Sequence, residues 1–245
     1  MGDAVHSSSH FVEGKLFYSK HFVPIVLVGK TGVGKSAAGN TILGRKALKS
    51  KLSPSYVTDR IKVKGEVDGQ LVTVIETPGV FDTNCTKVEA MIKIEKCTSL
   101  CAPHPHVFLI VIQLGRFTPE QKEILKIIQT TFGEQTANYT MVLFTHGDRL
   151  KGTSIKEYLH DSPDLQRFIK QCHGGYHVFN NRDQNPSQVI KLLEKINKMV
   201  KRNGGSHYTT VMFQLAERKI EQKKQWILRE NNEKRQRDGR TEGTV

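Results

Sequence analysis

The sequence predicts an α/β fold built on a doubly wound, mostly parallel sheet with one antiparallel edge strand. Short apolar segments alternate along the chain with segments of helical periodicity. Most of the apolar segments are apolar on both faces, as in strands that helices cover from both sides. The exception is Ile61–Val67, which alternates apolar and polar residues and leads into Asp68-Gly69. This pattern predicts a hairpin, and therefore the antiparallel edge strand.

Further strands and the helices between them follow in regular order. The expected strands are Phe22–Val28, Leu71–Ile75, Val107–Ile112, Tyr139–Phe144 and Tyr176–Phe179. The expected helices are Ser36–Leu43, Lys87–Cys101, Pro119–Thr131, Ile155–His160, Pro163–Cys172 and Pro186–Val200. Three helices open with proline at or near the first turn, with Thr118, Ser162 and Asn185 as the expected N-caps. Repeated strand–helix units of this kind wind into one open sheet.

The alternation ends after Val200 at the sequence KRNGG. We therefore expect a flexible N-terminus over residues 1–20, one folded domain over 21–203 and a helical extension over 204–245. The last helix is expected from about Tyr208 to Arg237. Its apolar stripe fades toward the C-terminus, which we expect to fray.

Charge and composition limit the classes of function. The chain has 245 residues, 37 Lys+Arg, 24 Asp+Glu and a formal charge of +13. The positive charge is spread out and aromatic residues make up only 7%, which disfavours nucleic acid as a partner. A solvated surface with some affinity for anions fits better, and nucleotide phosphates or transiently met acidic lipid surfaces are both open.

Location signals are few. No apolar run approaches the roughly 20 residues of a transmembrane helix, and the N-terminus lacks the basic and apolar segments of a secretory signal. Four cysteines in a chain of 245 residues do not resemble a disulfide framework. These observations favour a reducing, cytoplasmic setting.

A phosphate-binding loop is the strongest motif. Gly29–Ser36 reads GKTGVGKS, follows an apolar strand and opens a helix, which is the context that distinguishes a P-loop from a chance match. Its glycines let backbone N–H groups turn toward phosphates. Lys35, expected to be exposed in the empty site, supplies a mobile charge, and Ser36 supplies a hydroxyl ligand for Mg²⁺. The motif predicts binding of a nucleoside triphosphate with Mg²⁺.

The base is read elsewhere, at the ends of later strands. Thr145-His146-Gly147-Asp148 follows the strand Tyr139–Phe144, where a guanine-specific protein presents an aspartate to the two donor nitrogens of the base. Asn180-Asn181-Arg182 follows the next strand. By itself, an aspartate after a strand is weak evidence for guanine.

Together, these segments resemble the family of GTPases of immunity-associated proteins (GIMAP), which are relatives of septins and chloroplast-import GTPases. The resemblance covers about residues 22–200. It rests on GKTGVGKSAAGNTILG, ETPGVFDT, LGRFT, THGD and FNNR, which occur in this order. It implies a Ras-like P-loop GTPase fold with a C-terminal helical extension, guanine nucleotide as ligand and low intrinsic hydrolysis. It also implies nucleotide-dependent homodimers or oligomers, and leaves association with other family members open.

The resemblance also assigns roles to residues. GTP or GDP would contact the phosphate loop and the base motifs, at Gly29, Lys30, Thr31, Gly32, Val33, Gly34, Lys35, Ser36, Ala37, His146, Asp148, Asn180 and Asn181. Mg²⁺ would be held by Ser36, Thr58 and Glu76. Thr58 and Gly79 would close on the γ-phosphate, and the imidazole of His146 would cover one face of guanine.

Three positions bear on catalysis. The family pattern has aspartate where this chain has Glu76, one methylene longer, and Val80 stands where Ras-type enzymes place the glutamine that orients the attacking water. Hydrolysis is therefore expected to be slow or completed by another group. Arg116, in LGRFT, is equally well interpreted as an arginine offered across a dimer or as an ordinary surface arginine near the next helix. A slow GTPase and a nucleotide-stabilised scaffold without significant turnover both remain open.

Overall fold

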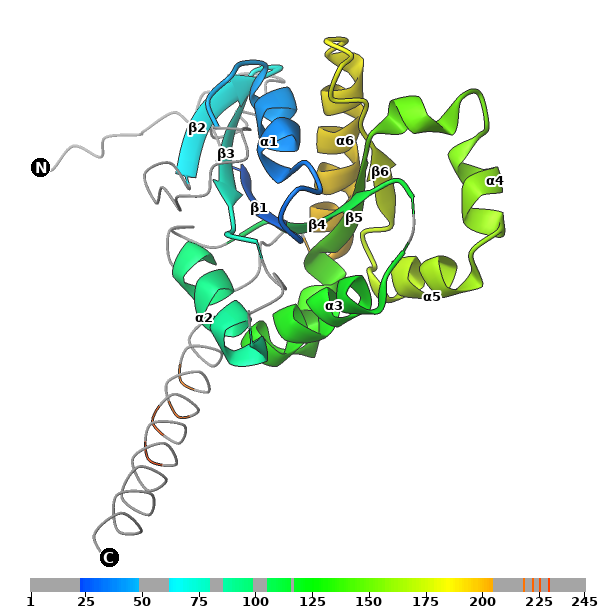
Figure 1. Ribbon diagram of the computed structural model, residues 1–245. Coiled ribbons are helices and arrows are strands. Elements are labelled where there is room, and N and C mark those ends of the chain that lie inside the picture. The colour runs from blue at the N-terminus through cyan, green and yellow to red at the C-terminus, as the bar shows by residue number, and fades with distance from the viewer. Residues whose placement is uncertain are drawn as a thin grey trace, which may run out of the picture.

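The computed structural model describes residues 23–48, 62–79, 86–98, 105–115 and 117–204, together with the helical residues 218, 222, 225 and 229. Its centre is a six-stranded sheet between two layers of helices (Figure 1). The expected α/β class with one antiparallel pair is confirmed.

The sheet has the strand order β2-β3-β1-β4-β5-β6. All neighbours are parallel except β2 and β3. The strands are β1 (Val23–Val28), β2 (Lys62–Val67), β3 (Gln70–Glu76), β4 (Val107–Gln113), β5 (Thr140–Thr145) and β6 (Tyr176–Val178). Because the five parallel strands point the same way, the loops that follow them meet at one edge of the sheet.

The predicted hairpin is formed by β2 and β3, with Val67 paired to Gln70. The two residues between them, Asp68 and Gly69, have φ angles of 50° and 72°. Positive φ at both central positions is the requirement of a type I′ turn, for which Asp-Gly is a favoured sequence.

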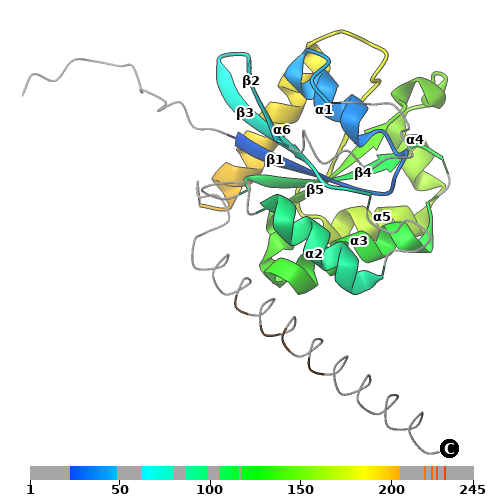
Figure 2. The ribbon, with the colours of Figure 1, turned by 60° about the vertical axis from the view of Figure 1, so that its left-hand side comes forward.

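Helices cover both faces of the sheet. Figure 2 shows α1 and α6 on one face and α2, α3 and α5 on the other, and in Figure 1 the short α4 lies at the outer edge beside α5. Their bounds are α1 (Lys35–Leu43), α2 (Lys87–Thr98), α3 (Pro119–Phe132), α4 (Ile155–His160), α5 (Pro163–Gln171) and α6 (Ser187–Arg202).

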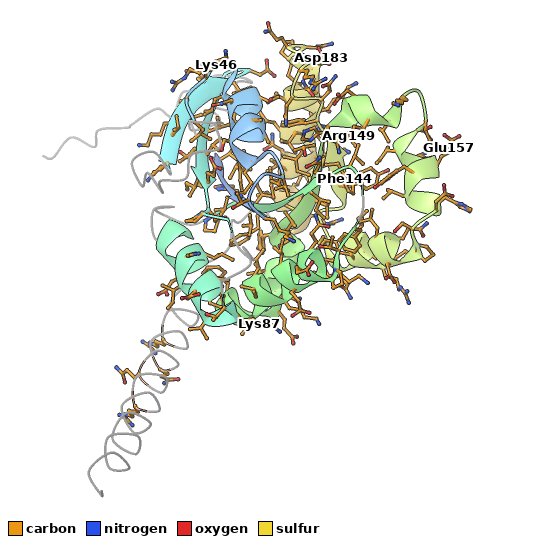
Figure 3. The ribbon with its side chains drawn as sticks, in the orientation of Figure 1. Lys46, Lys87, Phe144, Arg149, Glu157 and Asp183 are labelled. Atoms are coloured by element: carbon orange, nitrogen blue, oxygen red, sulfur yellow. The ribbon has the colours of Figure 1, made fainter. Side chains whose placement is uncertain are left out.

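Each face of the sheet has its own apolar core. The alternation along β1 illustrates the division: Ile25 and Leu27 pack toward α1 and α6, whereas Val26 and Val28 pack toward α2 and α3. All four side chains are completely buried. Phe144, labelled in Figure 3, belongs to the core on the side of α2 and α3, and its ring meets the ring of Tyr176 edge-on. Burial on both faces explains why these strands read as continuous apolar runs.

Some expectations about the elements need correction. Asn185 is not the N-cap of α6: Pro186 is, and the Asn185 side chain accepts a hydrogen bond from the Ser187 N–H within the preceding turn. Two short 3-10 helices, η1 (Glu134–Tyr139) and η2 (Gly147–Leu150), were not anticipated. The expected helix from Tyr208 to Arg237 lies outside the described residues, except for the four helical residues named above.

Candidate nucleotide-binding site

The phosphate loop connects β1 directly to α1. Gly32 and Gly34 have φ angles of 82° and 95°, a conformation that side-chain-bearing residues rarely adopt. Gly29 is needed for a different reason, because a Cβ there would lie 2.7 Å from the Val111 carbonyl oxygen of β4. The glycines of the motif thus fit the backbone conformation and the tight packing of this loop.

Lys35 lies folded against its own loop. Its Nζ donates to the carbonyl oxygens of Gly29 at 3.0 Å and Lys30 at 2.8 Å, and the residue is only 6% exposed. The expectation that Lys35 is exposed was therefore wrong. The loop carbonyls provide the ammonium group with acceptors, which a buried charge requires.

Ser36 and Glu76 lie in direct contact. The Ser36 hydroxyl, at the start of α1, donates to Glu76 Oε1 at 2.7 Å, at the end of β3. Burial raises the pKa of the Glu76 carboxyl group, and the Ser36 hydrogen bond and the charge of Lys35 act in the opposite direction. A hydroxyl and a carboxylate side by side are oxygen donors of the kind that Mg²⁺ prefers, so these two groups together could hold the ion.

The chain after β3 stays attached to β1. Both the N–H and the hydroxyl of Thr77 donate to the Leu27 carbonyl oxygen, at 3.0 and 2.9 Å. Two residues later, Gly79 is buried. These bonds carry the ETPG segment to the edge of the sheet at which the phosphate loop lies.

A hydrogen-bond chain joins the expected base motif to the phosphate loop. The Thr145 hydroxyl donates to the Val33 carbonyl oxygen at 2.7 Å, and His146 Nδ1 lies 3.1 Å from the same hydroxyl. Because the single hydroxyl hydrogen goes to Val33, the imidazole must be the donor through Nδ1. Burial, followed by the charge of Arg149, lowers the pKa of His146, so the neutral ring is favoured.

Asp148 lies on η2, and its side chain is partly exposed. Its carboxylate lies 3.4 Å from Arg182 Nη1, with side chains 31% and 83% exposed, respectively. The N–H of Gly147 donates to the Phe179 carbonyl oxygen at 2.9 Å, which holds the two loops together. The THGD and FNNR segments are therefore neighbours, as the sequence predicts.

Asn180 and Asn181 have different surroundings. Asn180 stabilises its own loop, because its side-chain oxygen accepts from the Arg182 N–H at 3.1 Å. The side-chain oxygen of Asn181 accepts from the Thr41 hydroxyl of α1 at 3.0 Å. Sequence reasoning missed Thr41 and the bridging role of Thr145, although both stand inside segments quoted for the resemblance.

Some of the remaining predicted site residues are described by the structure and others are not. Lys30 Nζ lies 3.7 Å from a carboxylate oxygen of Glu120 at the start of α3, Thr31 is exposed, Val33 is buried and Ala37 is half-buried. Thr58, Val80 and Arg116 lie outside the described residues.

Comparison with known proteins decides the family. The AIG1 family matches residues 23–227 of this chain. The chain belongs to the AIG1 family. It is 36% identical over 199 residues to immune-associated nucleotide-binding protein 9 of Arabidopsis thaliana, covering 77% of this chain and 58% of that protein. It is 33% identical over 189 residues to human GTPase IMAP family member 8, covering 75% and 28%, respectively.

This AIG1 family member thus covers less than two thirds of the length of each of these two relatives. Among solved structures, it resembles Toc33 from Arabidopsis thaliana in complex with GDP and Mg²⁺, with a TM-score of 0.56 and 20% identity over 74% of this chain and 85% of Toc33. The structure of a dimerization-deficient mutant of Toc33 matches with a TM-score of 0.57 and 19% sequence identity, over the same shares of the two chains. These likenesses show a shared G-domain fold. Within the described part of the AIG1 chain, no helix is both long and apolar enough to cross a membrane.

Proposed function

We propose that this AIG1 domain binds GTP and GDP together with Mg²⁺. The observation that carries the proposal is the meeting of two motifs at one edge of the sheet, where Thr145 ties the base loop of Asp148 to the phosphate loop of Lys35. A fixed distance between a phosphate-binding loop and a base-reading loop is what recognition of a whole nucleotide requires. Relatives named as nucleotide-binding proteins and GTPases support it.

Phosphate binding requires Lys35 to exchange partners. Its ammonium group now donates to the carbonyl oxygens of Gly29 and Lys30, and phosphate oxygens offer stronger, charge-assisted bonds. The backbone N–H groups of the glycine-rich loop and of the start of α1 supply further donors to an anion.

Mg²⁺ fits the oxygen donors at the base of the loop. Ser36 would hold it, with Glu76 as the nearby carboxylate and Thr58 as a further hydroxyl. When bound, Mg²⁺ neutralises charge on the phosphates. In the absence of the ion, the Ser36 hydroxyl keeps the half-buried Glu76 carboxylate supplied with a donor.

Selection of guanine falls to Asp148. Guanine presents two donor nitrogens on the edge that a carboxylate can accept, whereas adenine does not present this pair. Before a base binds, the Asp148 carboxylate is paired with Arg182, whose Nη1 lies 3.4 Å from a carboxylate oxygen. Neutral His146 offers a ring to cover the base, and Gly79, Asn180 and Asn181 complete the proposed contacts.

We further propose that the domain hydrolyses GTP slowly, as a cytoplasmic switch that acts as a homodimer or oligomer. Val80 cannot orient water, so acceleration must come from charge supplied at the γ-phosphate. Arg116, offered in trans, is our candidate, because such an arginine can be worth about 10³–10⁵ in rate. Dimerization is important for the GTPase activity of the chloroplast translocon components atToc33 and psToc159, which is consistent with this idea.

Single-turnover GTP hydrolysis, measured over a range of protein concentrations, tests the proposal. We expect the rate per molecule to rise with concentration, and Arg116→Ala to remove the rise while leaving GTP affinity nearly intact. A rate that is negligible at every concentration, with GTP still bound, would favour the nucleotide-stabilised scaffold instead.

A further inference from the structure

The arginine that follows Asp148 ties the base loop to a neighbouring strand. Because an arginine offers only donors, the Gln113 side chain is oriented with its oxygen toward Arg149. That oxygen accepts from both terminal nitrogens of Arg149, at 2.6 and 2.9 Å, and Arg149 Nη1 also donates to the Leu114 carbonyl oxygen at 3.3 Å. Arg149, labelled in Figure 3, thus presents its fork of donors to the end of β4.

This contact braces the loop close to the point where it leaves the sheet. Gln113 and Thr145 are partners in the register of β4 and β5, and the Leu114 N–H donates to the Thr145 carbonyl oxygen at 3.1 Å. The chain leaves β5 at Thr145, turns through η2, and returns to the end of β4 through the side chain of Arg149. The turn that carries Asp148 is therefore attached to β4 on both sides of the aspartate.

The backbone of this turn requires such attachment. His146 before η2 and Lys151 after it have φ angles of 60° and 47°, in the left-handed region that residues with side chains rarely adopt. Conformations of this kind persist where the surrounding structure enforces them. The Arg149 N–H closes the turn by donating to the His146 carbonyl oxygen at 2.9 Å, and the Arg149 side chain then connects the closed turn to β4.

The Asp148 carboxylate depends on this backbone for its position. Its ion pair with Arg182 spans 3.4 Å, and the arginine side chain is 83% exposed. An ion pair with that exposure contributes little to holding a side chain in place. Hydrogen bonds weaken steeply when distance or angle departs from the ideal, so the placement of the loop decides how well the carboxylate can accept from a base.

The contacts of Arg149 contribute more to this placement than to the stability of the domain. Arg149 is exposed, so its hydrogen bonds compete with water and water can replace them. Both of its terminal nitrogens already donate to protein oxygens. This arrangement favours a role in holding the loop over direct contact with a ligand.

We propose that Arg149 is a positioning residue for base recognition, and that its hydrogen bonds to Gln113 hold Asp148 where the carboxylate accepts from guanine. The inference rests on the proposed binding of guanine by Asp148. Because adenine does not present the same pair of donors, a displaced loop weakens GTP binding and leaves ATP binding nearly unchanged. The preference for GTP over ATP therefore reports on the arginine, whereas a general loss of stability would weaken the binding of both nucleotides alike.

The test is titration of the full chain with fluorescent GTP and ATP analogues and Mg²⁺, for wild type, Arg149→Met, Asp148→Ala and the double variant. Arg149→Met keeps an unbranched side chain without donors. We expect it to lower the preference for GTP about tenfold and to leave ATP affinity and melting temperature near those of wild type. In the Asp148→Ala background it should change the preference no further, because it acts through the aspartate. Arg167→Gln, at an exposed arginine of α5, is the matched control and should keep the preference.

Variants of Gln113 test the same contact from its other side. Gln113→Leu removes the accepting oxygen and should lower the preference for GTP, whereas Gln113→Glu keeps oxygen acceptors for the arginine and should retain it. A further measurement needs no nucleotide: the Gly147 amide, which donates to the Phe179 carbonyl oxygen, should exchange its hydrogen faster in Arg149→Met than in wild type. Its exchange in Arg167→Gln should be unchanged.

The outcomes separate this inference from the proposed function. If Asp148→Ala removes the preference for GTP but Arg149→Met retains it, the positioning role is wrong and the proposed function stands. Wild-type exchange of the Gly147 amide in Arg149→Met would also overturn the positioning role, because the loop would then be held without the arginine. If wild type shows no preference, or Asp148→Ala leaves it unchanged, the assignment of guanine is wrong and the inference fails with it.

Discussion

The Ser36 hydroxyl donates to the Glu76 carboxylate across 2.7 Å and thereby joins the start of α1 to the end of β3. Each of the two residues is an expected magnesium ligand, and each occurs in a different motif, 40 positions apart. Although its side chain is one methylene longer than that of aspartate, Glu76 brings its carboxylate into contact with the Ser36 hydroxyl. The hydroxyl at position 36 is thus both a proposed Mg²⁺ ligand and the hydrogen-bond donor to the Glu76 carboxylate.

We expect Ser36→Asn to damage Mg²⁺-dependent GTP binding more than GDP binding. The substitution replaces the hydroxyl that is the proposed Mg²⁺ ligand by a larger amide, and losing one such interaction costs about 1–3 kcal/mol. GTP affinity at saturating Mg²⁺ should fall about tenfold or more. Ser36→Thr keeps a hydroxyl and is the matched control. Affinities for both nucleotides, measured with and without Mg²⁺, check the prediction, and an equal loss for GTP and GDP in Ser36→Asn would contradict it.

Lys35→Ala should abolish detectable triphosphate binding while the domain stays folded. The lysine supplies the charge that reaches the phosphates, and both hydrogen bonds that it now makes lie within its own loop, so their loss breaks no contact between separate elements. Calorimetric titration with GTP, together with a melting curve, is the measurement. Lys46→Ala, which removes an exposed lysine just after α1 (Figure 3), should bind GTP as wild type does. Normal GTP binding by Lys35→Ala would show that the phosphate loop is misassigned.

The architecture was predictable because its signals are local. Apolar runs in a covered sheet, the Asp68-Gly69 turn and the glycine pattern of the phosphate loop each depend on a few neighbouring residues. The strand and helix ranges agree with the structure to within a few residues, apart from ends that fall outside the described part of the chain. The sequence also predicts that the THGD and FNNR loops are neighbours, because parallel strands end at one edge of the sheet.

Contacts between distant residues were not predictable in the same way. Thr145 and Val33 are 112 positions apart, and nothing in either segment indicates that the hydroxyl of one meets the carbonyl of the other. Lys35 was expected to be exposed to solvent because the motif indicates which ligand group the lysine binds. The motif does not indicate which protein groups the lysine contacts when no ligand is bound. Asn185 has the composition of an N-cap, but its side chain closes a turn one residue earlier, and Pro186 takes the cap position.

Acid should destabilise the domain through His177. Burial, followed by the charge of Lys195, lowers the pKa of this histidine from 6.5 to about 4, although a hydrogen bond to the Gln188 carbonyl oxygen acts in the opposite direction. The unfolded chain therefore binds the proton first as pH falls. The histidine imposes no cost above about pH 6.5, and the cost grows to about 3 kcal/mol as pH falls to about 4.

Denaturant unfolding at several pH values between 4 and 6.5 measures this dependence. His177→Gln removes the titration and should give a shallower loss of unfolding free energy with acidification than wild type. His160→Gln, at a side chain that is 87% exposed, should keep the wild-type slope. If His177→Gln and wild type lose stability in parallel, another group is responsible.

Guanine selectivity of the full chain tests the central claim most directly. Fluorescent GTP and ATP analogues are titrated with Mg²⁺ into wild type, Asp148→Ala and the control Asp161→Ala, which changes an exposed aspartate after α4. With adenine, the Asp148 carboxylate loses two hydrogen-bond donors, at about 1–3 kcal/mol or more. We predict a preference for GTP of roughly tenfold to several hundredfold in wild type and Asp161→Ala, and its loss in Asp148→Ala. Equal affinities in wild type, or an unchanged preference in Asp148→Ala, would contradict the account.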